Sequence, residues 1–325
     1  MTLDGGCATT PQVETERRET RMSTVCWLGL GHMGLPMASQ LRAQGFDVQG
    51  FDPSADASEA ARLAGIRPCL SPVEAASGAD VVFTMLPTYA HVHRALSTPG
   101  LLEATAEDAL IVDCSTISGP DARELAAFVV PSGRRFLDAP VSGGTPGAHA
   151  GTLTFMVGGP NQAVTVLTPF LEAMGSRIFH VGEVGCGQSA KTVNNMMLAM
   201  NMASVAEAAV LGERLGLEHK TLVEIVKVSS GDSWVLRNFY PVAGVVDNAP
   251  ANDDFTPGFT TALMRKDVGL ALTSAAGHPV DLGMTAEVAR RLDRMIEAGL
   301  GGQDFSALVH VASGALDREL DGAVS

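Results

Sequence analysis

Residues 185–200, GCGQSAKTVNNMMLAM, begin an apolar run that continues to Gly216. Glycines delimit the run, and Ala, Met, Leu and Val fill nearly every turn between them, which predicts one long helix over about 187–215. We expect most of its circumference to be buried. Lys191 and Asn195 lie four residues apart, so an amine and an amide share one face of the helix. Lys191 is therefore either a buried functional lysine or a lysine that extends from the first turn to solvent.

The first patterned unit of the chain is a strand, a glycine turn and a helix. Gly29, Gly31 and Gly34 form the spacing G-x-G-x-x-G where the strand ends. The first glycine allows a tight turn, the second lets a pyrophosphate reach backbone N–H groups, and the third lets the helix pack closely on the strand. Asp52 closes the second strand at the spacing of a ribose-binding acid. We predict dinucleotide binding, rather than an incidental glycine-rich turn, by Gly29, Leu30, Gly31, His32, Met33, Gly34 and Asp52.

The charge of Asp52 also bears on the choice of dinucleotide. A carboxylate accepts hydrogen bonds from the ribose hydroxyls but repels a 2′-phosphate. Residues 53–56 contain no arginine to bind that phosphate, although Arg62 follows at short range. The sequence therefore favours NAD over NADP as the cofactor.

Apolar strands alternate with helices through the first half of the chain. The runs at 79–87 and 109–116 are β-branched and lack polar alternation, as in strands covered on both faces. Further strands are expected at 134–144, 152–159 and 177–182. This alternation predicts an α/β domain of the Rossmann type.

Several residues follow these strands at the carboxyl edge, where open α/β sheets bind ligands. Leu86, Pro87 and Thr116 occupy such positions. His91 comes next, at the start of the following helix, and is either a cofactor contact or an ordinary surface histidine.

The segment 138–154, DAPVSGGTPGAHAGTLT, follows a strand directly but is too polar and glycine-rich for a core element. Ser142 offers a hydroxyl, and Gly143 and Gly144 let their N–H groups approach an anion such as a carboxylate. We expect a ligand-binding loop here, the alternative being a plain hairpin connection.

Beyond Gly216 the sequence predicts only helices. They are expected at 218–230, 260–277, 285–300 and 304–314. Lys266, beside Asp267, lies in the second of them and is either a site residue or part of a surface ion pair. The irregular connection 231–259 carries five aromatic residues that we interpret as helical core rather than substrate wall: Trp234, Phe239, Tyr240, Phe255 and Phe259.

Composition narrows the class of protein further. A chain of 325 residues suggests two domains, 23–184 and 185–325, after a loose polar tail at 1–22. The net charge of −14 argues against nucleic acid and anionic membrane as partners. Five scattered cysteines without a C-x-x-C pair indicate reduced thiols, a cytoplasmic location and no metal site. No uninterrupted apolar run is long enough to span a membrane.

The motifs taken in order resemble the β-hydroxyacid dehydrogenase family, from about Ser23 to the C-terminal helices. They are GLGHMGLPMA, MLPT, VDCSTI, DAPVSGGTPGAHAGTLTFMVGG, GCGQSAKTVNNMML, SSGDSW and LMRKDVGLA. SSGDSW, residues 248–250 and RKDVGLA are most similar to the 3-hydroxyisobutyrate dehydrogenases of that family. The resemblance implies a Rossmann-type N-terminal domain, a long interdomain helix, an all-helical C-terminal domain used in oligomer contacts, and an active site in the cleft.

The resemblance also implies roles for individual residues. Lys191 matches the catalytic general acid and base, and Asn195 the neighbour that orients the substrate. Ser142, Gly143 and Gly144 match the loop that binds the substrate carboxylate. Lys266 is expected to close on cofactor and substrate, and the remaining family cofactor positions are Leu86, Pro87, His91 and Thr116. The implied reaction is NAD-dependent oxidation of 3-hydroxyisobutyrate to methylmalonate semialdehyde, a step of valine degradation, by a homo-oligomeric dimer or tetramer.

Three alternatives remain open. The first is another member of the family, such as a tartronate semialdehyde or glyoxylate/succinic semialdehyde reductase that uses NADPH, and Asp52 argues against it. The second is a non-catalytic dinucleotide-binding module, and the third an imine reductase of the same fold. Retention of Lys191 and Asn195 argues against both.

Overall fold

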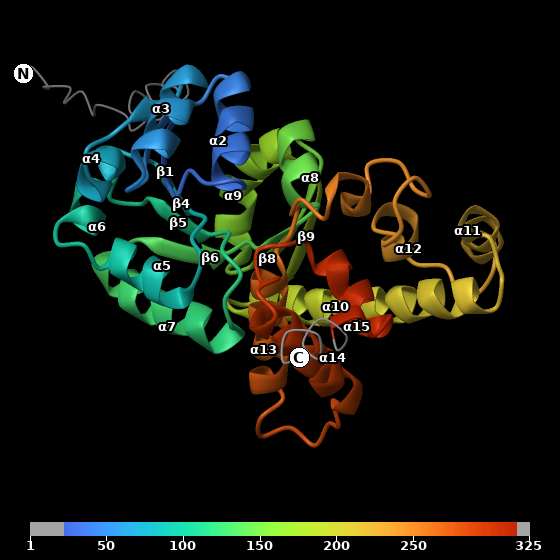
Figure 1. Ribbon diagram of the computed structural model, residues 1–325. Helices are drawn as coiled ribbons and strands as arrows, with labels where there is room; N and C mark the ends of the chain where they lie inside the picture. The colour runs from blue at the N-terminus through green and yellow to red at the C-terminus, as the bar shows by residue number, and fades with distance from the viewer. Residues whose placement is uncertain (1–22, 317–325) are drawn as a thin grey trace, which may run out of the picture.

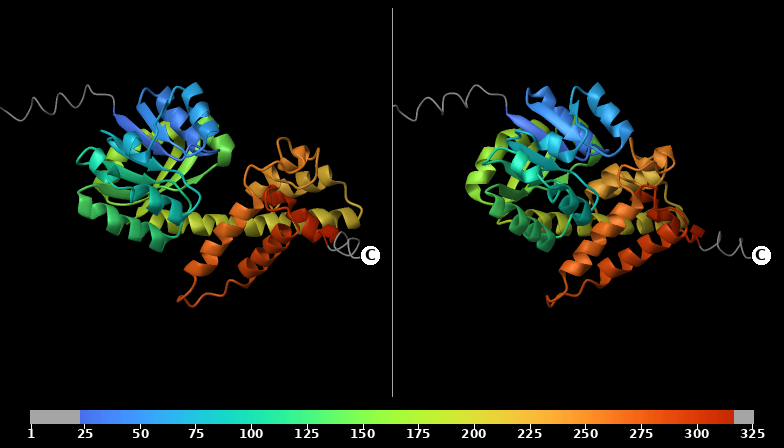
Figure 2. Two further views of the ribbon diagram at one scale, coloured as in Figure 1. Left: turned by 60° about the vertical axis from the view of Figure 1, so that its left-hand side comes forward. Right: turned by 90° about the vertical axis from the view of Figure 1, so that its left-hand side faces the viewer.

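The computed structural model describes residues 23–316, so the expected tail at 1–22 lies outside the described residues. A lobe of strands and covering helices is followed by the long helix α10 (Cys186–Arg214), which leads into a helical region (Figure 1). Turned views show α10 reaching from beneath the sheet lobe into the helical region (Figure 2). The chain therefore has the expected architecture, an N-terminal α/β lobe followed by helices.

The sheet begins as a parallel array in the order β3-β2-β1-β4-β5-β6, which is typical of dinucleotide-binding folds. These strands are β1 (Thr24–Leu28), β2 (Asp47–Phe51), β3 (Arg67–Pro68), β4 (Val81–Thr84), β5 (Leu110–Asp113) and β6 (Arg135–Asp138). Because they are parallel, all six end at one edge, where ligands of such sheets bind.

Beyond β6 the sheet continues with strands that run in both directions. The strand β8 (Leu153–Gly158) runs antiparallel to β6 and to β7 (Val141–Ser142), and it pairs in parallel with β9 (Gly175–Gly182). The segment expected as an irregular ligand loop thus contains the short strand β7 and the helix α8 (Gly144–Ala150). Its glycines mark the strand-to-helix turn, because Gly143 and Gly144 have φ values of 134° and 63°.

Each face of the sheet packs on its own set of helices. Along β1, Val25 and Trp27 join a cluster on one face, whereas Cys26 and Leu28 join a cluster on the other. The first face is covered by α2 (Gly34–Ala43), α3 (Ala55–Leu63), α8 and α9 (Asn161–Met174). The second is covered by α4 (Pro72–Ala76), α5 (Tyr89–Leu96), α6 (Leu101–Ala104) and α7 (Gly119–Val129). Two-sided burial explains why these strands are apolar without alternation.

The long helix is buried on one face only, so the expectation of burial around most of its circumference is wrong for the single chain. Lys191, Asn195 and Met202 lie on the buried face. Val193 and Met197 are each 53% exposed. Because apolar residues occur on every side of this helix, the sequence has no single polar face that would indicate which side packs against the rest of the chain.

The helical region has its own apolar core, built around the distal part of α10 and containing Met202, Val268, Leu292 and Phe305. Its elements are α11 (His219–Lys227), α12 (Trp234–Asn238), α13 (Thr261–Ser274), α14 (Gly283–Glu297), a 3-10 turn (Phe305–Leu308) and α15 (Val309–Ala312). The connection 231–259 is less irregular than expected, because it contains α12 and a 3-10 turn at Pro250–Asp253.

The aromatic residues of this connection divide into two groups. Tyr240 is 1% exposed, and Phe239, Phe255 and Phe259 pack on the core, as expected. The prediction is wrong for Trp234, which is 55% exposed and contacts the ring of Phe239 from outside. Since an aromatic residue at the start of a short helix can pack inward or outward, the residue type alone did not decide its burial.

Candidate active site

A buried tryptophan, Trp27, donates a hydrogen bond to the glycine turn that follows β1. Trp27 Nε1 donates to Gly29 O at 3.0 Å, and Gly29 has a φ of 96° that favours glycine. A Cβ on Gly34 would overlap Gly29 O, so the first turn of α2 packs directly on the glycine turn. A Cβ on Gly31 would meet nothing within 4 Å. The turn therefore leaves open space at Gly31, which fits the phosphates of a dinucleotide at the start of α2.

Asp52 lies directly after β2 and is fixed by backbone hydrogen bonds. Its Oδ2 accepts from Leu30 N at 2.8 Å, and its Oδ1 accepts from Ser54 N at 2.9 Å. Each carboxylate oxygen retains acceptor capacity for a ribose hydroxyl. Leu30 is buried, whereas His32 is exposed and Met33 is the residue before α2. The acid and the glycine turn thus form one unit, as their spacing predicted.

Two loops at the carboxyl edge are joined through Ser115. Leu86 N donates to Ser115 Oγ at 2.9 Å, which ties the segment after β4 to the segment after β5. Pro87 is exposed and Thr116 half-buried beside this contact. His91 lies in α5, where its Nδ1 is 2.7 Å from Thr88 Oγ1, so its side chain is held by its own helix start.

A buried carboxylate lies beneath these loops. Asp113 is fully buried at the end of β5, where Thr84 Oγ1 donates to its Oδ1 at 2.7 Å and Ser115 N at 3.1 Å. Burial raises the pKa of Asp113 to about 6, against the lowering effect of the bonds from Ser115 and Thr84. Asp113 therefore joins the ends of β4 and β5 through its hydrogen bonds, and its burial shields it from solvent.

A second buried carboxylate, Asp138 at the end of β6, holds the start of α10. Its Oδ1 accepts from Gly185 N at 2.7 Å, and its Oδ2 accepts from Gln188 N at 2.8 Å. It thereby satisfies two of the free N–H groups at the helix start. A Cβ on Gly187 would overlap Met156 O of β8, so only glycine permits this close approach. The glycines expected to start the helix are thus explained by its docking on the sheet.

Lys191 lies in the second turn of α10 and is 9% exposed. Burial lowers the pKa of Lys191 to about 8, and the positive charge of Lys266 acts in the same direction. The negative charge of Asp267 opposes this shift. A lysine with this pKa is partly neutral near pH 8, so it can both accept and return a proton. The alternative of a solvent-exposed lysine is excluded by its burial.

Asn195 and Lys266 meet at Asp267 of α13. Asn195 Nδ2 donates to Asp267 Oδ2 at 2.5 Å, and Lys266 Nζ lies 3.1 Å from Asp267 Oδ1. Lys266 Nζ also donates to Thr116 O at 2.6 Å. Thus α10, α13 and the loop after β5 converge on one cluster of charged and amide side chains, in which Asn195 and Asp267 are buried. The ion pair considered for Lys266 exists, but its acid is 2% exposed and is not a surface residue.

The expected carboxylate-binding residues lie at the turn between β7 and α8. Ser142 ends β7, Gly143 precedes α8, and Gly144 is the first residue of that helix. Both glycines are exposed and Ser142 is half-buried. The hydrogen bonds that join Lys266, Thr116, Asn195 and Asp267 do not include these three residues.

Three residues of the site were not singled out from the sequence: Asp138, Gln188 and Asp267. Each is buried, and each acts on a partner at least 47 residues away in the chain. The only sequence signal was their position, since Asp138 follows a strand, Gln188 lies between the helix-start glycines and Lys191, and Asp267 follows Lys266. A polar residue beside a motif is not distinctive without knowledge of its partner.

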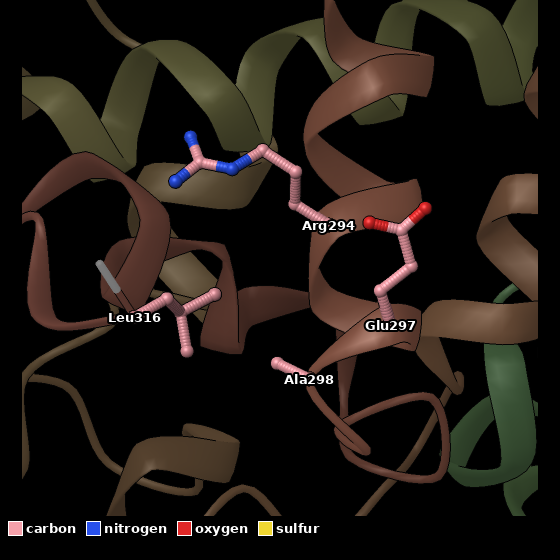
Figure 3. Close-up of a pocket in the computed structure, with 4 residues that line it drawn as sticks. All are labelled: Arg294, Glu297, Ala298 and Leu316. Carbon is pink, nitrogen blue, oxygen red and sulfur yellow. The ribbon is translucent and has the colours of Figure 1, made fainter. Parts of the chain in front are cut away.

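Within residues 23–316 there is no group of three or more His, Cys, Asp or Glu residues arranged to hold a metal ion. Among these residues no helix is both long and apolar enough to cross a membrane. A hollow of about 200 Å³ lies on the helical region, and none of the predicted site residues lines it (Figure 3). Its walls are Arg294, Glu297, Ala298 and Leu316.

The sheet order, the glycine turn and the buried lysine together define a dinucleotide-dependent dehydrogenase. Family models match both halves of the chain. Residues 24–182 match the NAD binding domain of 6-phosphogluconate dehydrogenase. Residues 185–312 match the model described as NAD-binding of NADP-dependent 3-hydroxyisobutyrate dehydrogenase.

Individual relatives agree with these models. A probable 3-hydroxyisobutyrate dehydrogenase of Mycobacterium tuberculosis is 43% identical over 298 residues, which cover 91% of this chain and all of the relative. An NAD-dependent L-serine dehydrogenase of Pseudomonas aeruginosa is 44% identical over 290 residues, covering 88% and 97%. A solved structure of the M. tuberculosis 3-hydroxyisobutyrate dehydrogenase with L-serine has a TM-score of 0.83 at 43% identity, covering 90% and 99%.

The chain belongs to the β-hydroxyacid dehydrogenase family and within it is most like the 3-hydroxyisobutyrate dehydrogenases. It is an NAD-dependent oxidoreductase. The predictions of fold class, family and cofactor are thereby confirmed.

Proposed function

We propose that this protein oxidises the primary alcohol of 3-hydroxyisobutyrate to methylmalonate semialdehyde with NAD, as in valine degradation. The observation that carries the proposal is the buried Lys191, whose pKa is lowered to about 8 mainly by burial. A base with this pKa removes a hydroxyl proton at mildly alkaline pH. The similarity to 3-hydroxyisobutyrate dehydrogenases at 43% identity supports this choice of alcohol.

Oxidation of the primary alcohol removes a hydride from its carbon and a proton from its oxygen. Bound NAD supplies the hydride acceptor, C4 of its nicotinamide ring. Lys191 Nζ in its neutral form takes the hydroxyl proton and later passes it to solvent. Asn195, held by Asp267 at 2.5 Å, orients the substrate oxygen. In the reverse direction the ammonium form of Lys191 polarises the carbonyl and returns the proton.

The substrate carboxylate is assigned to the turn between β7 and α8. The N–H groups of Gly143 and Gly144 and the hydroxyl of Ser142 are suited to bind an anion, because glycine lets the backbone approach it closely. The exposed glycines support access to this turn. Lys266 is assigned to contacts with cofactor and substrate, which its bond to Thr116 O supports.

Cofactor binding is assigned to 29–34 and Asp52, with further contacts from Leu86, Pro87, His91 and Thr116. The open space at Gly31 and the fixed carboxylate of Asp52 support this assignment. We place the boundary between the two domains at Gly185, so that residues 23–184 bind the cofactor and residues 185–325 supply Lys191.

L-serine is the second candidate substrate. One relative at 44% identity is named an NAD-dependent L-serine dehydrogenase, and one similar structure contains L-serine. Serine carries the same primary alcohol beside a carboxylate, so the same lysine serves either reaction, and the amino group makes the difference.

A substrate panel tests the proposal. Initial rates are measured with 3-hydroxyisobutyrate, L-serine, 3-hydroxypropionate and tartronate, each with NAD and with NADP. The highest kcat/KM is expected for 3-hydroxyisobutyrate with NAD. A higher kcat/KM for L-serine would assign the chain to serine oxidation, and a preference for NADP would contradict the role of Asp52.

We also propose that the protein is a homo-oligomer, a dimer or tetramer. Its support is the number of exposed apolar residues on α10 and α11, since Val193, Met197, Leu211 and Ile225 are each more than half exposed. Light scattering after size-exclusion chromatography tests this proposal, and a monomer at micromolar concentration would contradict it.

A further inference from the structure

The side-chain amide of Gln188 hydrogen-bonds through both its nitrogen and its oxygen to one short backbone segment, residues 115–117. The side chain is fully buried in the first turn of α10. Its Nε2 donates to Ser115 O at 2.7 Å, and its Oε1 accepts from Ile117 N at 3.2 Å. The amide thus pairs with the segment 115–117 as a neighbouring strand would.

The segment 115–117 is also bound from α13. Thr116 O, between the two groups that Gln188 contacts, accepts from Lys266 Nζ at 2.6 Å. Three successive residues after β5 are therefore held by side chains of the two helices that carry the proposed substrate site. Ser115 in turn accepts from Leu86 N, so the loop after β4 is held through the same point.

Gln188 lies three residues before Lys191 on α10, so the two side chains share one side of the helix. The start of this helix cannot shift freely, because Asp138 accepts from Gly185 N and Gln188 N. The amide of Gln188 thus joins the helix that carries Lys191 directly to the loop that carries Thr116.

We propose that Gln188 is a positioning residue that sets the distance between Lys191 and the cofactor loop at Thr116. This rests on the proposed roles of Lys191 and Thr116. The hydride and the proton leave the same alcohol group of the substrate. Their acceptors, C4 of nicotinamide and Lys191 Nζ, must therefore be held at a fixed distance from each other, because a small misplacement lowers turnover. A buried amide with two bonds to backbone holds that register more rigidly than apolar packing does.

Two substitutions in the full-length enzyme test this inference. Gln188→Met keeps the length of the side chain but removes both hydrogen bonds, and we expect kcat to fall by about tenfold to a hundredfold. In Gln188→Glu a carboxyl group faces Ser115 O. Its complete burial and the carboxylate of Asp138, which accepts from Gln188 N, favour its protonated form, whereas the positive charges of Lys191 and Lys266 oppose it; we expect burial to prevail. That form can donate to Ser115 O and accept from Ile117 N, as the amide does.

The ratio of Gln188→Glu turnover to wild-type turnover is therefore expected to rise as the pH is lowered from 9 to 6. The new carboxylate also acts on Lys191, whose pKa responds to nearby charges, so the acidic limb of each protein is fitted with its own pKa and divided out before the ratio is taken. Ser189→Ala is the matched control, because Ser189 Oγ donates only within its own turn, to Gly185 O. Its turnover should stay near that of wild type.

Binding of NADH, followed by its fluorescence, is measured in parallel and does not depend on the identity of the alcohol. The rates are taken with whichever alcohol of the panel wild type oxidises fastest, so a wrong substrate proposal leaves this test intact. Unchanged kcat in Gln188→Met, or a Gln188→Glu ratio that stays as low as that of Gln188→Met at every pH, would reduce Gln188 to a packing residue. A tenfold fall in kcat with a ratio that recovers at low pH would support positioning.

Discussion

Asn195 on α10 donates a hydrogen bond of 2.5 Å to the carboxylate of Asp267 on α13, 72 residues further along the chain. The same carboxylate lies 3.1 Å from Lys266 Nζ and acts electrostatically on Lys191. Asp267 is thus a shared counter-charge for two lysines and an anchor for the amide beside them. This arrangement makes the charge state of Lys191 adjustable from α13.

Replacing the proposed base should remove most of the turnover. Lys191→Met keeps the length of the side chain and removes the amine, so kcat should fall on the order of a hundredfold or more, the usual share of general acid-base catalysis. The wild-type rate of alcohol oxidation should decline below pH about 8, where Lys191 becomes protonated, and the mutant's residual rate should lack this limb.

Lys220→Met is the matched control for this substitution, since Lys220 is exposed on α11. It should retain wild-type rates and the same pH profile. Near-normal turnover in Lys191→Met would place the base elsewhere, and Lys266 would then be the next residue to test.

The same substitution should stabilise the fold near neutral pH. Burial lowers the pKa of Lys191 from 10.5 to about 8, so between these values the unfolded chain holds a proton that the folded one lacks. The free energy of unfolding therefore rises with pH across this window, and below it the buried charge costs on the order of 3 kcal/mol.

Lys191→Met lacks that cost. Its melting temperature at pH 7 should exceed that of wild type by roughly 5 °C, and the difference should shrink toward pH 10. A melting temperature at pH 7 below that of wild type would mean that the lysine is better compensated than its burial indicates.

Substitutions of Asp267 and Lys266, the two charged neighbours of Lys191 on α13, should shift the acidic limb of the pH profile, the fall in rate as Lys191 is protonated, in opposite directions. Asp267→Asn removes a negative charge that raises the pKa of Lys191, so the limb of kcat/KM should move to lower pH. Lys266→Met removes a positive charge that lowers this pKa, so the limb should move to higher pH. Shifts of the same sign in both variants would show that another group titrates.

Cofactor choice should depend on Asp52. Asp52→Asn removes a charge that repels a 2′-phosphate and weakens the acceptors for the ribose hydroxyls, so KM for NAD should rise about tenfold and that for NADP much less. Asp56→Asn makes the same change of charge on the exposed first turn of α3 and is the control. An unchanged preference for NAD in Asp52→Asn would refute the assignment.

Two glycines of the same turn should respond differently to alanine. The added Cβ at Gly31 meets nothing, so Gly31→Ala should leave the melting temperature unchanged while weakening NAD binding. The added Cβ at Gly34 overlaps Gly29 O, so Gly34→Ala should lower the melting temperature by several degrees. Unaltered NAD binding in Gly31→Ala would show that the open space is not used by the cofactor.

Local sequence patterns predicted a large part of the fold and part of the candidate site. The glycine spacing and the position of Asp52 predicted a unit that is joined by the bond between Leu30 N and Asp52. Apolar runs predicted the strands, because a strand covered on both faces needs no polar residues. The four-residue spacing of Lys191 and Asn195 was enough to place both on one face of α10.

Tertiary structure decided which face of α10 is buried, because apolar residues occur on every side of this helix and leave no sequence signal for its packing side. It also decided the partners of Asp138, Gln188 and Asp267. Each of these polar side chains acts across a docking contact between segments distant in the chain. Such pairs depend on the relative positions of helices and sheet, whereas a sequence pattern reports only the geometry of one segment at a time.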